Sequence, residues 1–118
     1  MTRLHTVIET PSYLSDARHC KVSDEERAAI VDSIAKSPKG GDLVQNTGGV
    51  RKVRIAKPGK GKSGGYRVIT VFFSEDAPVY LLAMLSKGER ANFSADDKKA
   101  FRAMTSEIKK EQKGEKDG

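Results

Sequence analysis

Two runs of β-forming residues constrain most strongly how this chain can fold, because they are too apolar to be left on a surface. Residues 66–73 are nearly all β-branched or aromatic, and residues 79–85 are the longest apolar stretch of the chain. A short apolar run of this kind, bounded by turn residues, is typical of a central strand that is buried on both faces. The turn between the runs is rich in acidic residues and contains a proline. We therefore expect a sheet with these two runs as central strands.

The residues that precede this region predict one strand and two helices. The β-branched segment 6–10 is expected to be a first strand, and Pro11 suits the first turn of a helix that runs to about Cys20. Ser23 and Glu26 have the spacing of a capping box, which predicts the start of a second helix. The proline and glycines that follow should end it. Each helix has one apolar face, which needs a sheet to cover.

A further strand is predicted at residues 50–56, where apolar and polar residues alternate. In a strand this alternation places Lys52 and Arg54 side by side on one face, about 7 Å apart. Residues 57–65 contain so many glycines that we expect a loop between this strand and the next one. The basic face of residues 50–56 is therefore connected directly to the start of the strand at 66–73.

A last helix is predicted from Ser94, a serine followed by an acidic residue three positions later. Apolar residues recur at helical spacing as far as Ile108 and give the helix one apolar face. Residues 109–118 combine charged residues with glycine and are expected to form a solvated, disordered tail. The predicted order is strand, helix, helix, three strands and helix, an α+β fold in a single domain over residues 1–108.

The positive charge of the chain is concentrated in one central segment. The formal net charge is +6 at pH 7, yet residues 43–74 contain no Asp or Glu, and the remainder is close to neutral. The basic residues of this segment are Arg51, Lys52, Arg54, Lys57, Lys60, Lys62 and Arg67. Concentrated positive potential favours a polyanionic partner such as nucleic acid.

Side chains that usually carry hydrolytic or metal chemistry are scarce. The chain has two histidines and one cysteine, which cannot supply the clustered ligands of a usual metal site. We therefore expect no metal and no other cofactor. A single cysteine also excludes a disulfide scaffold. Together with the lack of a secretory signal and of an apolar stretch long enough to cross a bilayer, it favours a cytoplasmic location and no membrane partner.

RNA is a polyanion that supplies its own nucleophile, since a 2′-OH can attack the adjacent phosphate. This reaction requires in-line positioning, removal of the 2′ proton, stabilisation of charge on the phosphorane and protonation of the leaving 5′ oxygen. Arginine suits the charge stabilisation, and lysine can exchange a proton where neighbouring cations lower its pKa. The candidates, which share one end of the predicted sheet, are Lys52, Arg54, Arg67 and Lys87.

Three stretches of the chain follow one another in an order and spacing that form a family signature. They are residues 49–69, which include the junction Lys62-Ser-Gly-Gly-Tyr-Arg67, residues 79–89, and the helix that Ser94 opens. In these stretches the chain resembles the RelE/HigB branch of the RelE/ParE toxin superfamily. The resemblance implies a RelE-like fold, in which a four-stranded antiparallel sheet with a mixed edge carries two N-terminal helices and a C-terminal helix. It also implies a toxin of a type II toxin–antitoxin system that cleaves mRNA in the ribosomal decoding site.

The resemblance also implies roles for individual residues. Lys52 and Arg54 match basic positions that bind and activate the RNA. Arg67 matches the phosphate-stabilising arginine, and Lys87 matches the basic position after the last strand. Well-studied members have arginine at that last position and a tyrosine further on, whereas this chain has Lys87 and Phe93, and a phenylalanine can only stack. The other RNA-binding candidates are Arg51, Lys57, Lys60, Lys62 and Tyr66.

The expected partners follow from the same resemblance, and two other functions remain open from the sequence. The partners are the ribosome with its mRNA, a cognate antitoxin of helix-turn-helix type, and operator DNA through the antitoxin complex only. One alternative is a ParE-like inhibitor of DNA gyrase, which shares the fold; the basic segment and Arg67 count against it. The other is a non-catalytic RNA- or ribosome-binding protein that uses the same basic patch.

Overall fold

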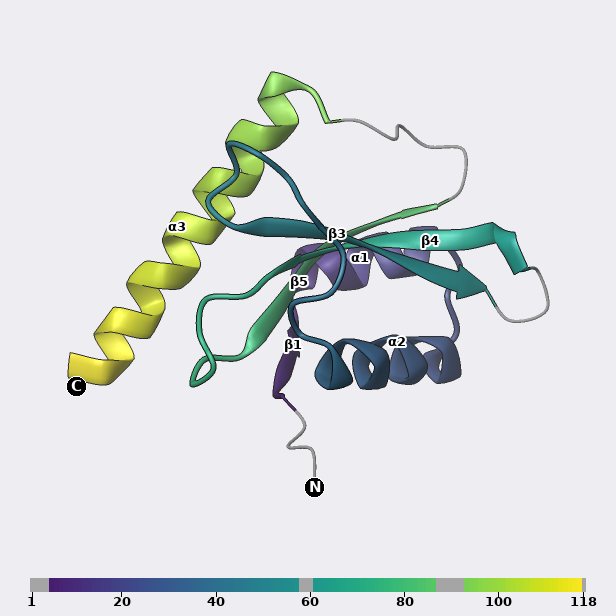
Figure 1. Ribbon diagram of the computed structural model, residues 1–118, viewed down its shortest axis with the longest axis horizontal. Helices are drawn as coiled ribbons and strands as arrows, with labels where there is room; N and C mark the ends of the chain where they lie inside the picture. Colours follow the sequence, from purple (N-terminus) through teal and green to yellow (C-terminus); the bar gives the residue numbers. More distant parts are fainter. Residues whose placement is uncertain (1–4, 58–60, 87–92, 118) are drawn as a thin grey trace.

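The computed structural model describes residues 5–57, 61–86 and 93–117 and has the predicted α+β class (Figure 1). The described elements in chain order are β1 Val7–Glu9, α1 Pro11–His19, α2 Asp24–Lys36, β2 Asp42–Leu43, β3 Val50–Lys57, β4 Gly61–Val71, β5 Val79–Ser86 and α3 Ala95–Asp117. The strands form one sheet in the order β1-β5-β4-β3-β2. Only β1, which is parallel to β5, departs from antiparallel pairing in this sheet. The sheet has five strands instead of the predicted four, because the short β2 adds to the edge of β3.

Both N-terminal helices begin where the sequence predicts, because side chains satisfy their first backbone N–H groups. The Thr10 hydroxyl accepts a hydrogen bond from the Tyr13 N–H at 3.2 Å, and Pro11 occupies the first turn of α1. At the start of α2 the Ser23 hydroxyl accepts from the Glu26 N–H, and the Glu26 carboxylate accepts from the Ser23 N–H, both at 3.1 Å. The predicted capping box is therefore confirmed.

The two faces of the sheet carry separate hydrophobic clusters. The helices α1 and α2 pack on the face of the sheet opposite to α3. The buried members of the cluster on this face are Tyr13, Ala17, Ile30, Ile34, Tyr66, Val68, Val79, Leu81 and Met84. On the other face the buried members are Val50, Ile69, Val71, Leu82 and Ile108, the last of which belongs to α3. β4 contributes to both clusters, as expected of a central strand.

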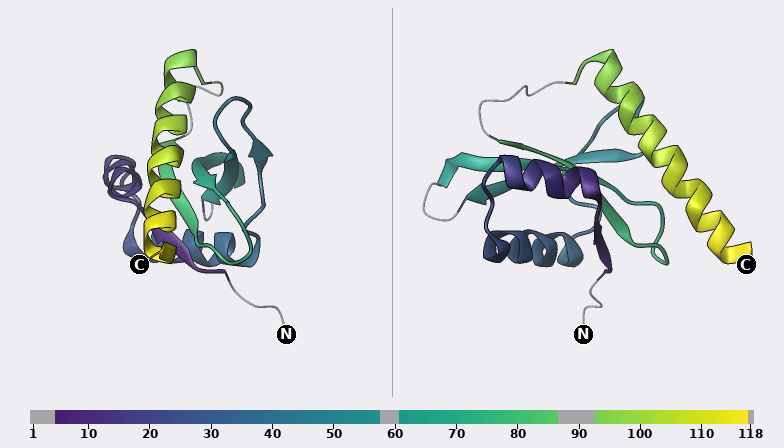
Figure 2. Two further views of the ribbon diagram at one scale, coloured as in Figure 1. Left: turned by 90° about the vertical axis from the view of Figure 1, so that its left-hand side faces the viewer. Right: turned by 180° about the vertical axis from the view of Figure 1, so that it is seen from behind.

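The helix α3 covers only part of its face. It crosses the sheet obliquely, and the hairpin of β3 and β4 extends away from it (Figures 1 and 2). The part of this face that lies toward the tip of the hairpin therefore has no described helix over it.

The hairpin is longer than the sequence predicts. The predicted loop at 57–65 is mostly strand, since β4 begins at Gly61 and Lys57 pairs with Gly61 after a register shift. A Cβ at Gly65 would lie 2.2 Å from the carbonyl oxygen of Ile55, so only glycine allows the two backbones to approach here. Pairing with β3 therefore outweighs the low strand propensity of these glycines.

The helix α3 ends at Asp117, later than the predicted end near Ile108. The residues beyond Ile108 are mostly lysine, glutamate and glutamine, which are good helix formers. An ion pair between Lys110 and Glu107, at 3.7 Å, also lies on the helix. The residues expected to form a tail thus continue the helix. No helix in the described parts of the chain is both long and apolar enough to cross a membrane.

Candidate functional site

The register of the hairpin places two arginines opposite each other. Arg54 of β3 is the Cα partner of Arg67 of β4, and Arg67 is in turn the partner of Leu85 of β5. Directly opposed residues of an antiparallel pair have Cα atoms about 4.5 to 5.5 Å apart and side chains on the same face. The sequence placed these arginines on neighbouring strands, and the structure shows that they form one cross-strand pair.

Two cross-strand pairs of β3 and β4 connect the arginine pair to the apolar core under α3. Lys52 is opposite Ile69, and Val50 is opposite Val71, on the same face as the arginines. Val50, Ile69 and Val71 are fully buried, whereas Lys52 is half-buried and Arg54 is exposed. This face therefore changes, within a few residues, from a core covered by α3 to a cationic surface toward the hairpin tip.

An aromatic side chain borders the cationic surface. The Nζ of Lys52 lies 5.8 Å from the centre of the Phe93 ring, within the range of a cation–π contact. Phe93 in turn packs edge-to-face on Phe101 of α3, with ring centres 5.1 Å apart. The structure thus places Phe93, a predicted RNA-binding residue, next to Lys52, a predicted catalytic residue.

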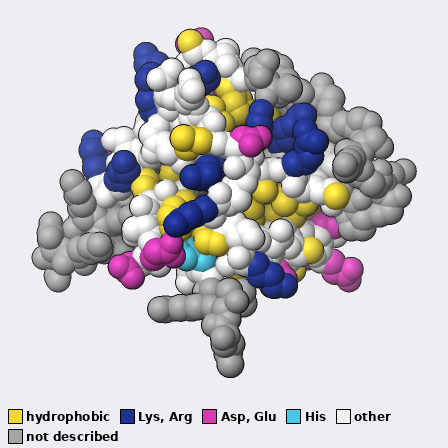
Figure 3. All heavy atoms as spheres, in the orientation of Figure 1, with side chains coloured by type: hydrophobic (Ala, Val, Ile, Leu, Met, Phe, Trp, Pro, Cys, Tyr) yellow, Lys and Arg dark blue, Asp and Glu magenta, His cyan; other side chains and the backbone are white. Residues whose placement is uncertain are grey.

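The arginine pair has no acidic partner within the described residues. Neither Arg54 nor Arg67 forms an ion pair there, although Arg27 and Lys36 elsewhere in the fold do. Figure 3 shows a group of Lys and Arg side chains on the surface over the β4 part of the sheet. Across the described ranges, no group of three His, Cys, Asp or Glu side chains is placed to hold a metal ion. The arrangement can bind an anion through charged hydrogen bonds alone.

Two of the predicted RNA-binding residues do not join this surface. Arg51 precedes Lys52 on β3 and therefore points to the opposite face, where its guanidinium donates to the Lys39 carbonyl oxygen at 3.1 Å. Tyr66 is only 6% exposed and belongs to the core under α1 and α2. Strand alternation separates both residues from the arginine pair, and their assignment to RNA binding stays a prediction.

The remaining candidates lie outside the part of the chain that the structure describes. This applies to Lys60 and Lys87 entirely and to the side chains of Lys57 and Lys62. The described backbone places Lys57 next to the hairpin tip and ends β5 at Ser86, the residue before Lys87.

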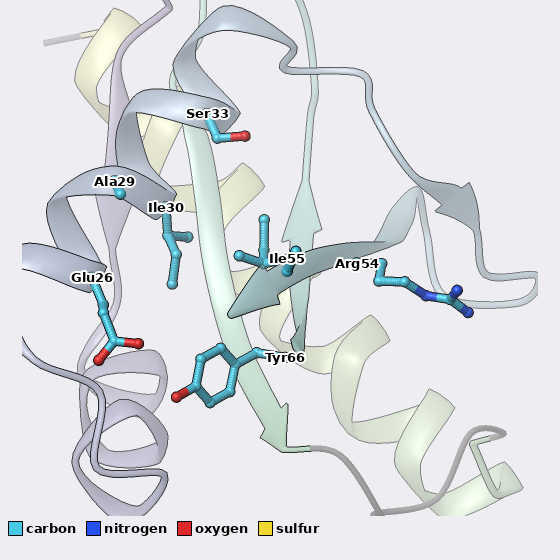
Figure 4. A pocket seen from close by; sticks show the side chains of 8 residues that line it. Glu26, Ala29, Ile30, Ser33, Arg54, Ile55 and Tyr66 are labelled. Carbon is cyan, nitrogen blue, oxygen red and sulfur yellow. The ribbon is translucent and has the colours of Figure 1, made fainter. Parts of the chain in front are cut away.

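A pocket that sequence reasoning missed lies on the opposite face of β3. It has a volume of about 280 Å³ and lies between α2 and the strands β3 and β4 (Figure 4). Figure 4 shows the Glu26 carboxylate and the Tyr66 ring directed toward this space and the Arg54 guanidinium directed away from it. The only sequence signal for Glu26 was its capping role, which uses one of its two carboxylate oxygens.

Comparison with known proteins assigns this fold and its cationic hairpin to a family. The family model described as the RelE toxin of the RelE/RelB toxin–antitoxin system matches residues 6–116. The chain belongs to the RelE toxin family. The match covers β1 and the helices as well as the hairpin with Arg54 and Arg67.

The solved structures support the same fold for this RelE-family chain. One match is the free state of an arginine-to-alanine double mutant of E. coli toxin RelE, with a TM-score of 0.52 and 15% sequence identity. The match covers 75% of this chain and 87% of that chain. At this identity the likeness shows the fold, and the family model shows that the chain is a toxin of a toxin–antitoxin family.

Proposed function

We propose that this RelE-family chain is a ribosome-dependent mRNA endonuclease that inhibits translation. The proposal rests on one observation above the others. Arg54 and Arg67 lie directly opposite each other toward the tip of the hairpin, where no described helix covers the sheet, and neither forms an ion pair with a described acidic residue. Two guanidinium groups in this arrangement suit a single phosphate group, which has oxygens for both.

The proposed reaction uses the 2′-OH of the mRNA as the nucleophile and needs no metal. As the 2′ oxygen attacks the adjacent phosphate, the phosphorane gains negative charge, and Arg54 and Arg67 stabilise it by charged hydrogen bonds. The bond to the 5′ oxygen then breaks and leaves a 2′,3′-cyclic phosphate. Lys52 and Lys87 are the lysines that we assign to proton exchange with the 2′ and 5′ oxygens.

The aromatic border of the site suits a nucleobase. Phe93 is held edge-to-face by Phe101 and lies beside Lys52, so a base stacked near Phe93 would place its phosphate near the cations. Stacking of a base on an aromatic ring contributes about 1 to 3 kcal/mol and tolerates any base. We therefore assign Phe93 to positioning the RNA, with Lys57, Lys60 and Lys62 as further phosphate contacts.

The toxin role comes with partners that we propose for this chain. They are a ribosome that carries mRNA in its decoding site and a cognate antitoxin that neutralises the toxin in the cytoplasm. The basic surface needs a partner of opposite charge in both cases, namely RNA on the ribosome and acidic side chains on the antitoxin.

The proposal is tested by incubating the purified protein with ribosomes that hold a defined mRNA in the decoding site, and by mapping new mRNA ends. The same mRNA without ribosomes and an Arg67→Ala variant serve as comparisons. We expect cleavage only on the ribosome and at least a hundredfold less of it in the variant. Binding to ribosomes without any cleavage would contradict the nuclease proposal and favour a non-catalytic binder. Intact mRNA together with inhibited DNA supercoiling would favour a gyrase inhibitor.

A further inference from the structure

The pocket between α2 and the hairpin of β3 and β4 plays no part in the proposed reaction. It lies on the face of the sheet opposite to the arginine pair, and Figure 4 shows the Arg54 guanidinium directed away from it. Its volume of about 280 Å³ is near the lower limit for small-molecule sites in proteins. The pocket is therefore large enough for a small organic molecule.

The pocket exists because one face of α2 leaves a gap above β3. Glu26, Ala29, Ile30 and Ser33 follow one another at spacings of three and four, so they lie on one face of the helix. Ala29 and Ser33 are small, and their side chains do not fill the space. Both are also exposed, which makes the pocket accessible from solvent. From Glu26 to Ser33 the helix rises by about 10 Å, which limits the length of a molecule lying along it.

The opposite wall of the pocket is apolar and aromatic. Ile55 of β3 and Tyr66 of β4 are Cα partners, so their side chains lie next to each other. Tyr66 is only 6% exposed, and Ile30 on the helix side is 3% exposed. The Tyr66 ring is directed toward the pocket (Figure 4). This wall favours a flat apolar group, since aromatic rings pack well on one another and on aliphatic side chains.

One end of the pocket carries a carboxylate oxygen that lacks a donor. Glu26 uses its Oε1 to accept from the Ser23 N–H at 3.1 Å, while its Oε2 is buried and has no hydrogen-bond partner among the described residues. The neighbouring Arg27 guanidinium is engaged by Glu9 and Asp24 instead. A buried carboxylate oxygen without a donor is costly, and an ammonium group would satisfy it by a charged hydrogen bond.

The charges around the pocket select a ligand with a single positive group. Of the described lining residues, only Glu26 and Arg54 are charged, and the Arg54 guanidinium is directed away (Figure 4). A second ammonium group on the ligand would therefore face apolar side chains, which is unfavourable. A carboxylate on the ligand would be repelled by Glu26. The pocket thus favours a monoamine over a diamine or an amino acid.

The volume of the pocket limits the size of the apolar part. A dry cavity of about 150 Å³ holds a benzene molecule, so this pocket has room for one ring and a short chain. We propose that the pocket binds a small primary amine with a flat apolar body, of the arylalkylamine class. The ammonium group binds the Glu26 carboxylate, and the ring packs between Ile30 and Tyr66.

The test titrates the isotopically labelled full chain with 2-phenylethylamine and follows the backbone amide shifts by NMR. Two comparison ligands share its ring and chain: 2-phenylethanol replaces the ammonium group by a hydroxyl group, and phenylalanine adds a carboxylate. Dissociation constants are obtained from the shifts. The titration contains no ribosomes and no mRNA, so its result is independent of the proposed nuclease activity.

Two pairs of variants separate the pocket from its surroundings. Glu26→Gln removes the charge but keeps a capping-box residue, and Glu25→Gln removes the same charge from the same helical turn outside the pocket lining. Ala29→Leu adds a larger side chain to the lining, and Ala28→Leu makes the same change at an exposed residue that does not line the pocket. Leucine is a good helix former, so both leucine variants should keep α2.

We expect 2-phenylethylamine to bind with a Kd of about 1 mM or below and to shift the amides of Ala29, Ser33 and Ile55. The alcohol and the amino acid should bind about tenfold more weakly. Glu26→Gln and Ala29→Leu should each weaken binding of the amine about tenfold, whereas Glu25→Gln and Ala28→Leu should change it less than about twofold.

Three results would overturn the inference. Equal affinities for the amine and the alcohol would show that the carboxylate takes no part. Equal losses in Glu25→Gln and Glu26→Gln would indicate a general attraction to the acidic end of α2. Unchanged amides of α2 and β3 at about ten times the expected Kd would show that the pocket holds no ligand of this class.

Discussion

The losses of cleavage rate caused by removing Arg54 and by removing Arg67 should not multiply when both are removed. The positions of the two side chains allow both to act on one phosphate. They are Cα partners in the register of β3 and β4. At a Cα separation of about 4.5 to 5.5 Å, two long side chains on one face reach the same group. The perturbation is a double-mutant cycle of Arg54→Ala, Arg67→Ala and the combined variant.

The size of each step follows from the role of the two arginines. Loss of one preorganised donor to a developing charge typically lowers the rate about 10² to 10³-fold, or about 2.7 to 4 kcal/mol. If the two arginines were independent, the double variant would lose the product of the two factors. Because each depends on the other to hold the phosphate, we expect the double variant to lose about tenfold more than either single variant. The coupling energy is then about 1.5 to 2.5 kcal/mol.

The assay is single-turnover cleavage of a defined mRNA on ribosomes at saturating protein, which reports the chemical step without product release. Circular dichroism and urea unfolding of each variant check that the fold is kept. A rate loss in the double variant equal to the product of the two single losses would show that the arginines act on different groups. A loss below fivefold in both single variants would refute the assignment of the phosphate site.

The remaining predictions concern single side chains. Arg51→Ala should lower single-turnover cleavage less than threefold, because Arg51 points to the opposite face and binds the Lys39 carbonyl; a loss equal to that of Arg67→Ala would contradict the register. Burial, and to a smaller extent Glu9, raises the pKa of Tyr13, so its contribution to stability is present below about pH 10 and is lost as the pH rises further. Above about pH 10, the unfolding free energy of the wild type should therefore fall with rising pH by about 1.4 kcal/mol per pH unit more than that of Tyr13→Phe. Urea titrations that give the same pH dependence for both proteins would contradict this. Asp16→Ala removes the acceptor of the Met84 N–H on β5 and should cost about 1 to 3 kcal/mol in urea unfolding, whereas Asp16→Asn, which keeps an acceptor, should cost less.

Local signals in the sequence were sufficient for most elements of the fold. Helix starts depend on contacts within a few residues. The hydroxyls of Ser23 and Ser94 accept hydrogen bonds from backbone N–H groups three residues later, and Pro11 lies in the first turn of α1. The two apolar runs form most of β4 and β5, because these residues are too apolar to be left on the surface. Helix capping depends on short-range geometry, and burial of a strand depends on how apolar its residues are. Both can be predicted from a single sequence.

Features that depend on pairing between distant segments were harder to predict. The two-residue strand β2 exists only because it pairs with β3, and β4 extends into a glycine-rich stretch because β3 provides partners for it. Tyr66 could be placed on a strand, but its burial depends on α2, which packs on that face. The intrinsic preferences of these residues do not carry this information.

The candidate site shows the same division. Alternation predicted that Lys52 and Arg54 share a face, and the structure confirms it. That Arg54 meets Arg67, and that Phe93 lies beside Lys52, depends on hairpin register and on the position of α3. Arg51 could have been assigned to the other face from alternation alone, because it is adjacent to Lys52 in the strand.

The central claim is that the arginine pair supports attack by an mRNA 2′-OH on the ribosome. The most direct test compares two mRNAs in the decoding site that differ by a single 2′-deoxy substitution at the mapped cleavage position, in the presence of wild-type protein. We predict that the unmodified mRNA is cleaved to a 2′,3′-cyclic phosphate end and that cleavage at the substituted position is abolished. Cleavage of both mRNAs at the same position and rate would contradict the account, since the nucleophile would then not be the 2′-OH.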